Sequence, residues 1–297
     1  MSAVLVESHD ALAAARRPNV PSAVVMTMGA LHEGHATLIR EARALVGETG
    51  CVIVTDFVNP TQFGAGEDFE RYPRSLEADV QLSGAAGADL VYAPTVTEIY
   101  GDASFITVDP GPLGDILEGA ARPGHFRGML TVVAKLLHLT ASDSALFGEK
   151  DYQQLVLIRQ MADDLNLDSR IIGVPTVRES DGLAMSSRNR YLNPEEREQA
   201  SALSSALLAG MYAAGGGPAA VLDAARAILD EVPAIITDYL ELRGPWLEDA
   251  PTAGPARLLV AARLGATRLL DNIAVELPDG HSAAHPGGAE QEMAWRN

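Results

Sequence analysis

Apolar runs and segments of helical periodicity alternate along much of the chain. The run 23–28 leads into a glycine-bearing turn, and apolar residues then recur at helical spacing through 38–46. The same signals predict strands at 51–58, 90–93, 105–108, 145–147 and 171–174, and helices at 76–86, 129–137 and 152–165. Strands that alternate with helices pair in parallel through crossover connections. We therefore expect an α/β fold with a doubly wound parallel-sheet nucleotide-binding domain, whose ligands bind beyond the carboxyl ends of the strands.

The pattern changes in the polar, glycine-bearing segment 178–190, which is typical of a hinge or lid. Asn193, Pro194 and Glu196 then form a capped helix start, and the helix is expected to run to about Ala214, before three glycines. A helix at 219–229 and strands at 237–242, 257–262 and 267–275 predict a small α+β domain with an antiparallel sheet. We place the boundary so that residues 1–177 form the Rossmann-like domain and 178–297 a smaller C-terminal lid domain.

Composition narrows the class of protein. The chain has 297 residues, enough for two modest domains, and 22 basic against 40 acidic residues give a net charge of -18. Such a charge repels phosphate backbones and argues against nucleic-acid binding, so an anionic ligand must meet a local cluster of cations. Cys51 is the only cysteine and sits in an apolar run, as a buried structural thiol would. Without a basic leader or an apolar stretch of spanning length, we expect a cytoplasmic protein with no membrane partner.

The first candidate site is Thr27-Met28-Gly29-Ala30-Leu31-His32-Glu33-Gly34-His35, where a predicted strand meets a helix. Glycines let the backbone approach a ligand, and free N–H groups at a helix start attract phosphate oxygens. Two histidines three residues apart lie on nearly the same helical face, so both imidazoles reach one phosphate chain. A surface pair or a metal site is the alternative, but no third His or Cys ligand lies nearby in the sequence.

Two further segments carry polar groups with the same chemistry. Phe147-Gly148-Glu149-Lys150-Asp151 follows another strand, and Lys150 offers a point charge to phosphates, although alone it would be an ordinary solvated turn. Asp181 to Asn189 places two hydroxyls and a guanidinium after a flexible glycine, as a closing loop or simply a linker would. A weaker candidate is the cationic loop Arg122-Pro123-Gly124-His125-Phe126-Arg127-Gly128. These segments predict a triphosphate site if the fold brings them together.

Together the segments resemble the H-I-G-H and K-M-S-K-S signatures of the nucleotidylyltransferase superfamily, with Met185-Ser186-Ser187-Arg188 in the second role. More closely, T-M-G-A-L-H-E-G-H, F-V-N-P-T-Q-F, F-G-E-K-D-Y-Q-Q-L and D-G-L-A-M-S-S-R-N-R-Y-L resemble the pantothenate synthetase family. The run T-R-L-L-D-N-I-A near the C-terminus is also similar to that family, so the resemblance spans nearly the whole chain.

The resemblance implies an ATP-dependent ligase. In that family pantoate attacks the α-phosphate of ATP to give pantoyl-adenylate and pyrophosphate, and β-alanine then displaces AMP. His35 would be the proton donor and His32 its neighbour on the phosphates, with Lys150 and Arg188 as the positive charges. The implied ATP site comprises Met28, Gly29, Ala30, Leu31, His32, Glu33, Gly34, His35, Gly148, Glu149, Lys150, Asp151, Val177, Met185, Ser186, Ser187 and Arg188. The implied pantoate ligands are Gln62 and Gln154, with Asn59 and Tyr72 near them.

The resemblance also implies Mg²⁺ beside ATP, with Asp79 as its ligand, and a homodimer. Three positions depart from the family's usual pattern: Met26 replaces a proline, Asp56 an apolar residue and Thr61 a larger apolar one. None is an implied catalytic group, so the departures bear on affinity. The alternatives are another small-molecule nucleotidylyltransferase, a tRNA synthetase fragment, which the acidic charge disfavours, and a regulatory nucleotide-binding protein.

Overall fold

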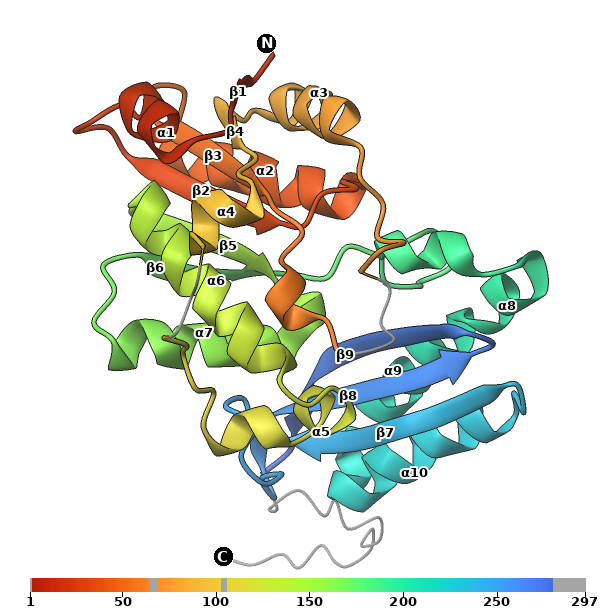
Figure 1. Cartoon of the computed structure of the whole chain (residues 1–297). Coiled ribbons are helices and arrows are strands. Elements are labelled where there is room, and N and C mark those ends of the chain that lie inside the picture. Colours follow the sequence, from red (N-terminus) through yellow and green to blue (C-terminus); the bar gives the residue numbers. More distant parts are fainter. Residues whose placement is uncertain (1, 65–68, 103–105, 280–297) are drawn as a thin grey trace, which may run out of the picture.

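Two β-sheets organise the chain in the computed structural model, which describes residues 2–64, 69–102 and 106–279 (Figure 1). The first sheet is parallel, has the strand order β1-β4-β3-β2-β5-β6, and comprises β1 (Val4–Val6), β2 (Ser22–Thr27), β3 (Cys51–Asp56), β4 (Leu90–Tyr92), β5 (Ser144–Gly148) and β6 (Arg170–Val174). The second is antiparallel, with β8 (Gly254–Leu264) between β7 (Ile235–Arg243) and β9 (Thr267–Leu277). The expected fold class is confirmed.

Helices cover both faces of the parallel sheet because its strands are buried on both sides. Successive β2 residues point to opposite faces, so Val24 packs with α1 (His9–Ala15), α6 (His125–Thr140) and α7 (Tyr152–Asp164). Val25 instead packs with α2 (Glu33–Val46) and α3 (Leu76–Ala86). This doubly wound arrangement leaves the carboxyl ends of the strands as the open edge of the sheet.

The antiparallel sheet has a hydrophobic core of its own. The helices α8 (Pro194–Gln199), α9 (Ser201–Tyr212) and α10 (Gly217–Asp230) precede it, and α9 and α10 pack against one face. Leu203 and Leu207 of α9 meet Leu258 of β8 in this core. The expected capping box is present, because Asn193 and Glu196 satisfy each other's backbone N–H groups at the start of α8.

Most element predictions are confirmed, and the differences have local causes. The helix expected to reach Ala214 is divided at Ala200 into α8 and α9. The second of these ends at Tyr212 and is followed by the short helix η5 (Ala213–Gly216). The strand expected at 105–108 is not formed by residues 106–108, and Phe105 lies outside the described residues. The backbone N–H of Val108 instead donates to Thr131 Oγ1 of α6. Short elements such as β1, α4 (Val96–Tyr100) and α5 (Glu118–Ala121) gave no periodic signal.

By length and composition alone, the helical stretch Pro194–Asp230 could cross a membrane, with a mean hydropathy of 1.3 in its most apolar window. The expectation that no segment approaches such a length is therefore wrong. The stretch is nevertheless broken into separate helices, of which the longest has 14 residues. A helix of that length spans about 21 Å, short of the roughly 30 Å of a bilayer core. Its buried apolar positions pack in the hydrophobic core with the antiparallel sheet.

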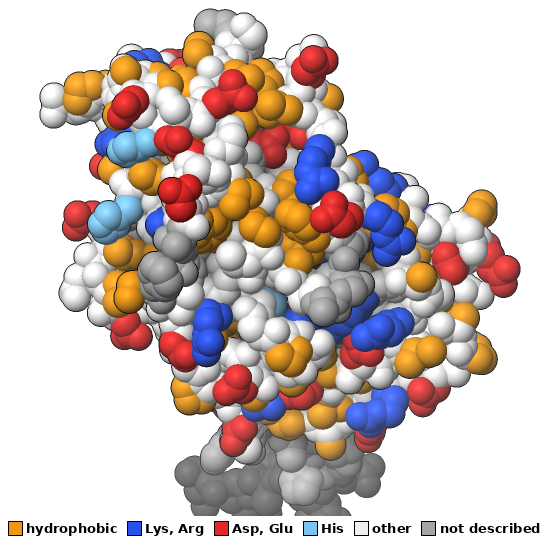
Figure 2. All heavy atoms as spheres, viewed as in Figure 1, with side chains coloured by type: hydrophobic (Ala, Val, Ile, Leu, Met, Phe, Trp, Pro, Cys, Tyr) orange, Lys and Arg blue, Asp and Glu red, His pale blue; other side chains and the backbone are white. Residues whose placement is uncertain are grey.

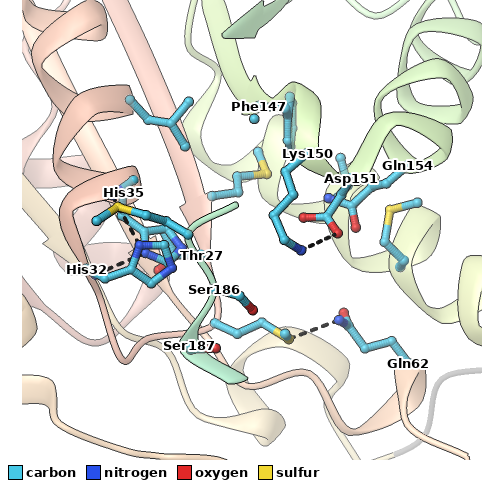
Figure 3. A pocket seen from close by; sticks show the side chains of 18 of the residues that line it. Thr27, His32, His35, Gln62, Phe147, Lys150, Asp151, Gln154, Ser186 and Ser187 are labelled. Carbon is cyan, nitrogen blue, oxygen red and sulfur yellow. Dashed lines mark hydrogen bonds and ion pairs between the residues drawn. The ribbon is translucent and has the colours of Figure 1, made fainter. Parts of the chain in front are cut away.

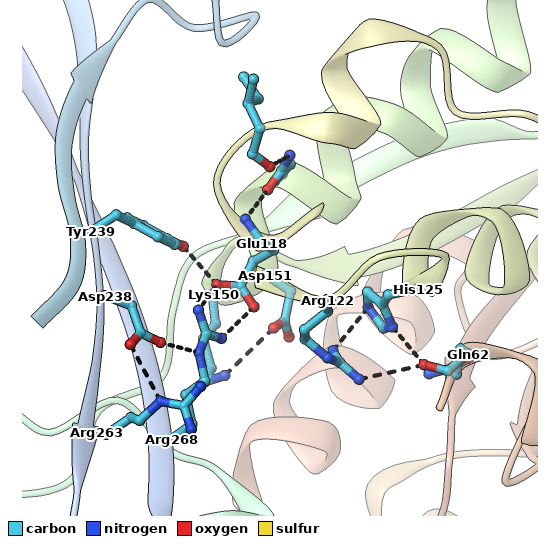
Figure 4. Close-up of polar contacts among 12 residues, drawn as sticks. Gln62, Glu118, Arg122, His125, Lys150, Asp151, Asp238, Tyr239, Arg263 and Arg268 are labelled. Carbon is cyan, nitrogen blue, oxygen red and sulfur yellow. Dashed lines mark hydrogen bonds and ion pairs between the residues drawn. The ribbon is translucent and has the colours of Figure 1, made fainter. Parts of the chain in front are cut away.

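A buried ion-pair network joins α5 to the antiparallel sheet (Figure 4). Glu118 accepts hydrogen bonds from Arg268 of β9 at 2.7 and 2.8 Å and from the Tyr239 hydroxyl of β7 at 2.9 Å. Arg268 also donates to Asp238 at 2.6 Å. The backbone N–H of Glu118 donates to Gln153 of α7, so Glu118 links elements that follow β4 and β5 to the second sheet. Burial and the neighbouring Glu118 carboxylate raise the pKa of Tyr239.

We expect Glu118→Ala to lower the free energy of unfolding by about 3 kcal/mol, because it leaves Arg268 with one carboxylate in a largely buried setting. The side chains of Glu118 and Arg268 are only 10% and 18% exposed. Urea-induced unfolding measures the change. Asp223→Ala is the matched control, since the Asp223 side chain in its pair with Arg226 is 76% exposed and such pairs contribute at most about 1 kcal/mol. Equal effects of the two substitutions would contradict the proposed role of the network.

Candidate active site

The candidate active site lies where the parallel sheet reverses its strand order. From β2 the chain proceeds outward through β3 and β4, whereas β5 returns to the other side of β2 and continues to β6. Ligands of doubly wound folds bind at such a switch point, beyond the carboxyl ends of the strands. A cleft of about 240 Å³ opens there and is lined by segments following β2, β5 and β6 and by the loop before η4 (Ser187–Tyr191). In Figure 2 several basic side chains border the hollow between the two parts of the molecule.

The turn after β2 is held by backbone hydrogen bonds to a buried carboxylate. Gly29 and Ala30 have positive φ values of 80° and 52°, which turn the chain sharply. The N–H groups of Ala30 and Leu31 then donate to the two carboxylate oxygens of Asp79 at 2.9 and 2.8 Å. Asp79 thus fixes the turn from behind, on the side away from the cleft.

Both histidines of this segment present the same edge to the cleft (Figure 3). His32 Nδ1 accepts from the N–H of Gly34 at 3.1 Å, and His35 Nδ1 accepts from the N–H of His32 at 3.2 Å. Because a backbone N–H only donates, each neutral ring carries its proton on Nε2. The ring centroids are 4.2 Å apart, and any Cβ on Gly34 would lie 2.9 Å from the His32 ring. The cleft therefore receives two adjacent N–H donors.

The environment keeps both imidazoles neutral. Burial, then the charges of Lys150 and Arg190, lower the pKa of His32. Burial, then the neighbouring His32, lower the pKa of His35 to about 3. A general acid works best with a pKa near the operating pH. A pKa of about 3 does not suit a general acid near neutral pH, so the His35 ring in this state can act on an anion only as a neutral hydrogen-bond donor.

Lys150 projects into the cleft from η3 (Glu149–Asp151), on the other side of the switch point. Its Nζ lies 3.5 Å from a carboxylate oxygen of Asp151. Burial raises the pKa of Asp151, but the charges of Lys150 and Arg188 outweigh it, so the pKa lies below its ordinary value. From β9, the Asn272 amide donates to the carbonyls of Glu149 and Lys150 at 2.9 and 2.8 Å. The second sheet thus sets the position of this turn.

The loop with the two hydroxyls closes the cleft from the opposite side. Ser186, Ser187 and Arg188 line it, and Ser186 Oγ accepts from the N–H of Arg188 at 3.2 Å. The loop begins at Arg178, which donates to both carboxylate oxygens of Asp271 on β9 at 2.6 and 3.0 Å. Asp271 and Asn272 are therefore supporting residues that the individual motifs did not reveal, although they belong to the late run that resembles the family.

The far end of the cleft is amide-bearing and apolar. Gln62 of η1 (Pro60–Gln62) and Gln154 of α7 line it, and Gln62 Nε2 lies 2.9 Å from Met28 Sδ. The weakly predicted loop is also part of the lining, since His125 Nδ1 contacts the Gln62 carbonyl at 2.8 Å. Apolar lining residues outside the predicted site residues include Leu38, Phe57, Phe63, Met129, Val132, Val133, Leu136 and Val174. On α6 their spacing is the same as that of ordinary core residues.

The structure brings most of the predicted residues to one cleft. Those that line it are Met28, His32, Gly34, His35, Gln62, Tyr72, Gly148, Lys150, Asp151, Gln154, Val177, Met185, Ser186, Ser187 and Arg188. Others lie outside the lining: Gly29, Ala30 and Leu31 build the turn, Glu33 pairs with Arg40, and Glu149 pairs with Arg257. Asn59 lies behind Gln62, to whose Oε1 its amide donates at 3.1 Å.

Asp79 does not fit the implied role of Mg²⁺ ligand. It is buried, it does not line the cleft, and its oxygens accept the two backbone N–H groups and the Ser75 hydroxyl. Within the described residues no group of three or more His, Cys, Asp and Glu side chains is arranged to hold a metal ion. In this structure the Asp79 carboxylate serves to hold the turn after β2.

The three unusual positions differ in their relation to the site. Met26 lines the cleft, whereas Thr61 and Asp56 are not part of its lining. Burial, then the neighbouring Asp79, raise the pKa of Asp56 to about 7. Its carboxylate fills the space beneath the first turn, since a Cβ on Gly29 would lie 2.5 Å from Asp56 Oδ1. The positive φ favours glycine at position 29, and any Cβ there would also have to displace the Asp56 carboxylate.

Comparisons with known proteins agree with this geometry. Residues 4–274 match the model of a family described as pantoate-beta-alanine ligase. Pantothenate synthetase of Mycobacterium sp. (strain KMS) is 62% identical over 279 residues, covering 92% of this chain and 88% of that protein. The crystal structure of pantothenate synthetase from Thermus thermophilus superposes with a TM-score of 0.87 at 44% identity, covering 93% of this chain and 100% of that one. Pantoate-beta-alanine ligase from Francisella tularensis, complexed with beta-gamma ATP and beta-alanine, gives a TM-score of 0.76 at 32% identity, covering 92% and 97%.

We expect neither His32 nor His35 to titrate near pH 6.5, because burial disfavours the charged ring. NMR of the imidazole Cε1–H groups between pH 5 and 8 measures this, with urea-unfolded protein as the control, whose histidines titrate near pH 6.5. The pKa of each ring is lower in the folded than in the unfolded protein, so the unfolded state takes up a proton at a higher pH. Each ring therefore lowers the free energy of unfolding as the pH falls below 6.5. A midpoint near 6.5 for His35 in the folded protein would contradict the assigned tautomer and burial.

Proposed function

This chain belongs to the pantoate-β-alanine ligase family, and we propose how the residues of its cleft divide the ATP-dependent ligation of pantoate with β-alanine. The reaction has two steps: a pantoate carboxylate oxygen attacks the α-phosphorus of ATP and expels pyrophosphate, and the amine of β-alanine then attacks the acyl carbon and expels AMP. The observation that carries the proposal is the convergence of three distant loops, with their cations and N–H donors, on one cleft.

The triphosphate is assigned to the space between the two histidines and Lys150. Nε2–H groups of His32 and His35 donate to phosphate oxygens from one side, and Lys150 supplies a positive charge from the other. Ser186, Ser187 and Arg188 complete the cage on a loop that can close over bound ATP. Negative charge grows on the departing pyrophosphate, so donors already fixed in position stabilise the transition state more than the ground state. The net negative charge of the chain makes these cations essential.

Pantoate is assigned to the amide-bearing end of the cleft. Gln62 and Gln154 can donate to its carboxylate and bond its hydroxyls, while Met129, Val132 and Val133 of α6 offer an apolar wall to its two methyl groups. This orientation directs the carboxylate towards the phosphates. Once the acyl-adenylate has formed, AMP is a good leaving group, and the amine of β-alanine completes the ligation.

Several finer assignments belong to this proposal. The boundary between residues 177 and 178 is supported by the separate hydrophobic cores on either side of it. A cytoplasmic location is supported by the single, buried cysteine and by the use of ATP. Mg²⁺ as a companion of ATP and assembly as a homodimer remain predictions from the family resemblance. The alternative of another nucleotidylyltransferase activity is set aside because the family match covers the chain.

Exchange of labelled pyrophosphate into ATP tests the first step alone. We expect exchange to require pantoate and to proceed without β-alanine, because the acyl-adenylate forms before the amine reacts. Omitting each substrate in turn provides the control. Exchange that occurs without pantoate, or that is absent with it, would overturn the assigned order of events.

The same assay relates the activity to the cleft. His35→Ala removes one fixed donor and is expected to lower the exchange rate by roughly 10²-fold. His138→Ala is the matched control, since His138 lies exposed in the last turn of α6, outside the cleft lining. Similar rates for both variants would remove His35 from its assigned role without affecting the identity of the reaction.

A further inference from the structure

Gln62 is held on several sides by groups that the reaction itself does not use. Its backbone carbonyl contacts His125 Nδ1 at 2.8 Å and accepts from Arg122 at 3.4 Å. Its side-chain Oε1 accepts from the amide of Asn59 at 3.1 Å. The remaining group, Nε2, points into the cleft and lies beside Met28 Sδ, which is a weak acceptor. The side chain is thus oriented before any ligand binds.

Two backbone groups determine which way Asn59 is oriented. Asn59 Oδ1 accepts from the backbone N–H of Thr61 at 3.3 Å, and Asn59 Nδ2 donates to the carbonyl of Gly128 at 3.2 Å. A backbone N–H only donates and a carbonyl only accepts, so the amide cannot be reversed. Asn59 is 1% exposed, which makes an unpaired amide group at this position costly.

Two hydroxyls complete the shell around Asn59 Oδ1. The Tyr100 hydroxyl of α4 donates to it at 2.7 Å. Thr61 Oγ1 lies 2.9 Å from Asn59 Oδ1 and 3.1 Å from the Tyr100 oxygen, and its single proton serves one of these two acceptors at a time. Neither Tyr100 nor Thr61 lines the cleft. Thr61 is also one of the three positions where the sequence departs from the usual family pattern, and it supplies a hydroxyl where a larger apolar side chain is expected.

We propose that Tyr100 and Thr61 are positioning residues that act through Asn59 to aim the amide nitrogen of Gln62 at an oxygen atom of pantoate. The inference rests on the proposed function, in which Gln62 contacts pantoate. The consequence is directional: because Oε1 is engaged by Asn59, Gln62 serves the ligand as a donor. A carboxylate or hydroxyl oxygen fits this group, whereas a ligand that presents only a donor at that point does not.

Close packing restricts other arrangements of this chain of contacts. A Cβ on Gly128 would lie 2.1 Å from the Thr61 carbonyl, so the glycine allows η1 to approach α6. The Tyr100 ring lies 6.4 Å from that of Phe57, and Lys135 Nζ lies 5.7 Å from its centroid. Burial raises the pKa of Tyr100, while the hydrogen bonds with Thr61 and Asn59 lower it, and the net shift is upward. The hydroxyl therefore stays protonated as a donor at neutral pH.

Tyr100→Phe is the test, with the pyrophosphate exchange assay as the readout. Loss of one hydrogen bond behind the ligand is expected to raise the KM for pantoate about 5-fold, with kcat and the KM for ATP nearly unchanged, since the effect is on binding. Thr61→Val, which keeps the side-chain volume, is expected to act in the same direction. Tyr92→Phe is the matched control, because the Tyr92 hydroxyl is buried and has no hydrogen-bond partner among the described residues.

A double-mutant cycle distinguishes positioning from general loosening of the fold. With Gln62→Met as background, Tyr100→Phe should have no further effect on the pantoate dissociation constant measured by titration calorimetry, because the group it orients is gone. The inference would be overturned if Tyr100→Phe weakened pantoate binding equally in the wild-type and Gln62→Met backgrounds. It would also be overturned if the KM for pantoate were unchanged in both Tyr100→Phe and Thr61→Val, or if Tyr92→Phe raised that KM as much as Tyr100→Phe. Failure of the wild-type chain to catalyse pantoate-dependent exchange would instead count against the proposed function.

Discussion

Hydrogen bonds to one strand of the small sheet fix two of the loops that line the cleft. Asn272 of β9 donates to the carbonyls of Glu149 and Lys150, and its neighbour Asp271 holds Arg178 at the root of the Ser186–Arg188 segment. The cleft segments that carry Lys150 and Arg188 are thus tied to a strand of the second sheet. Because the chain carries a net charge of -18, this local ordering of positive groups decides whether an anion binds at all.

The remaining polar groups of the cleft are oriented in a similar way. Backbone N–H groups donate hydrogen bonds to Nδ1 of His32 and His35, so the Nε2–H groups of both rings remain as donors. Asn59 takes up Oε1 of Gln62, which leaves its nitrogen for the ligand. Each of these side chains has one group that can donate and one that can accept a hydrogen bond. A protein group occupies the acceptor, so the group left for the ligand is a donor before the substrate binds. Preorganisation of this kind reduces the cost of ordering the site during the reaction.

Much of the fold and of the site could be predicted from the sequence, because strand periodicity is strong and each motif follows a strand. His35 and Lys150 come directly after β2 and β5, whose adjacency in a doubly wound sheet brings them together. The apolar wall of α6 could not be separated from core, since Met129 and Val133 have the spacing of any buried helix face. The metal role of Asp79 was implied by the family resemblance alone, and its contacts with Ala30 and Leu31 could not be predicted because they depend on tertiary structure.

We propose that three distant segments surround a single triphosphate, and a crystal structure with an unreactive ATP analogue and pantoate would reveal their arrangement. We expect phosphate oxygens within about 3 Å of His35 Nε2 and Lys150 Nζ, with Arg188 over the same phosphates and pantoate at Gln62. A triphosphate bound elsewhere, or one that contacts the histidines while Lys150 and Arg188 face other surfaces, would contradict it.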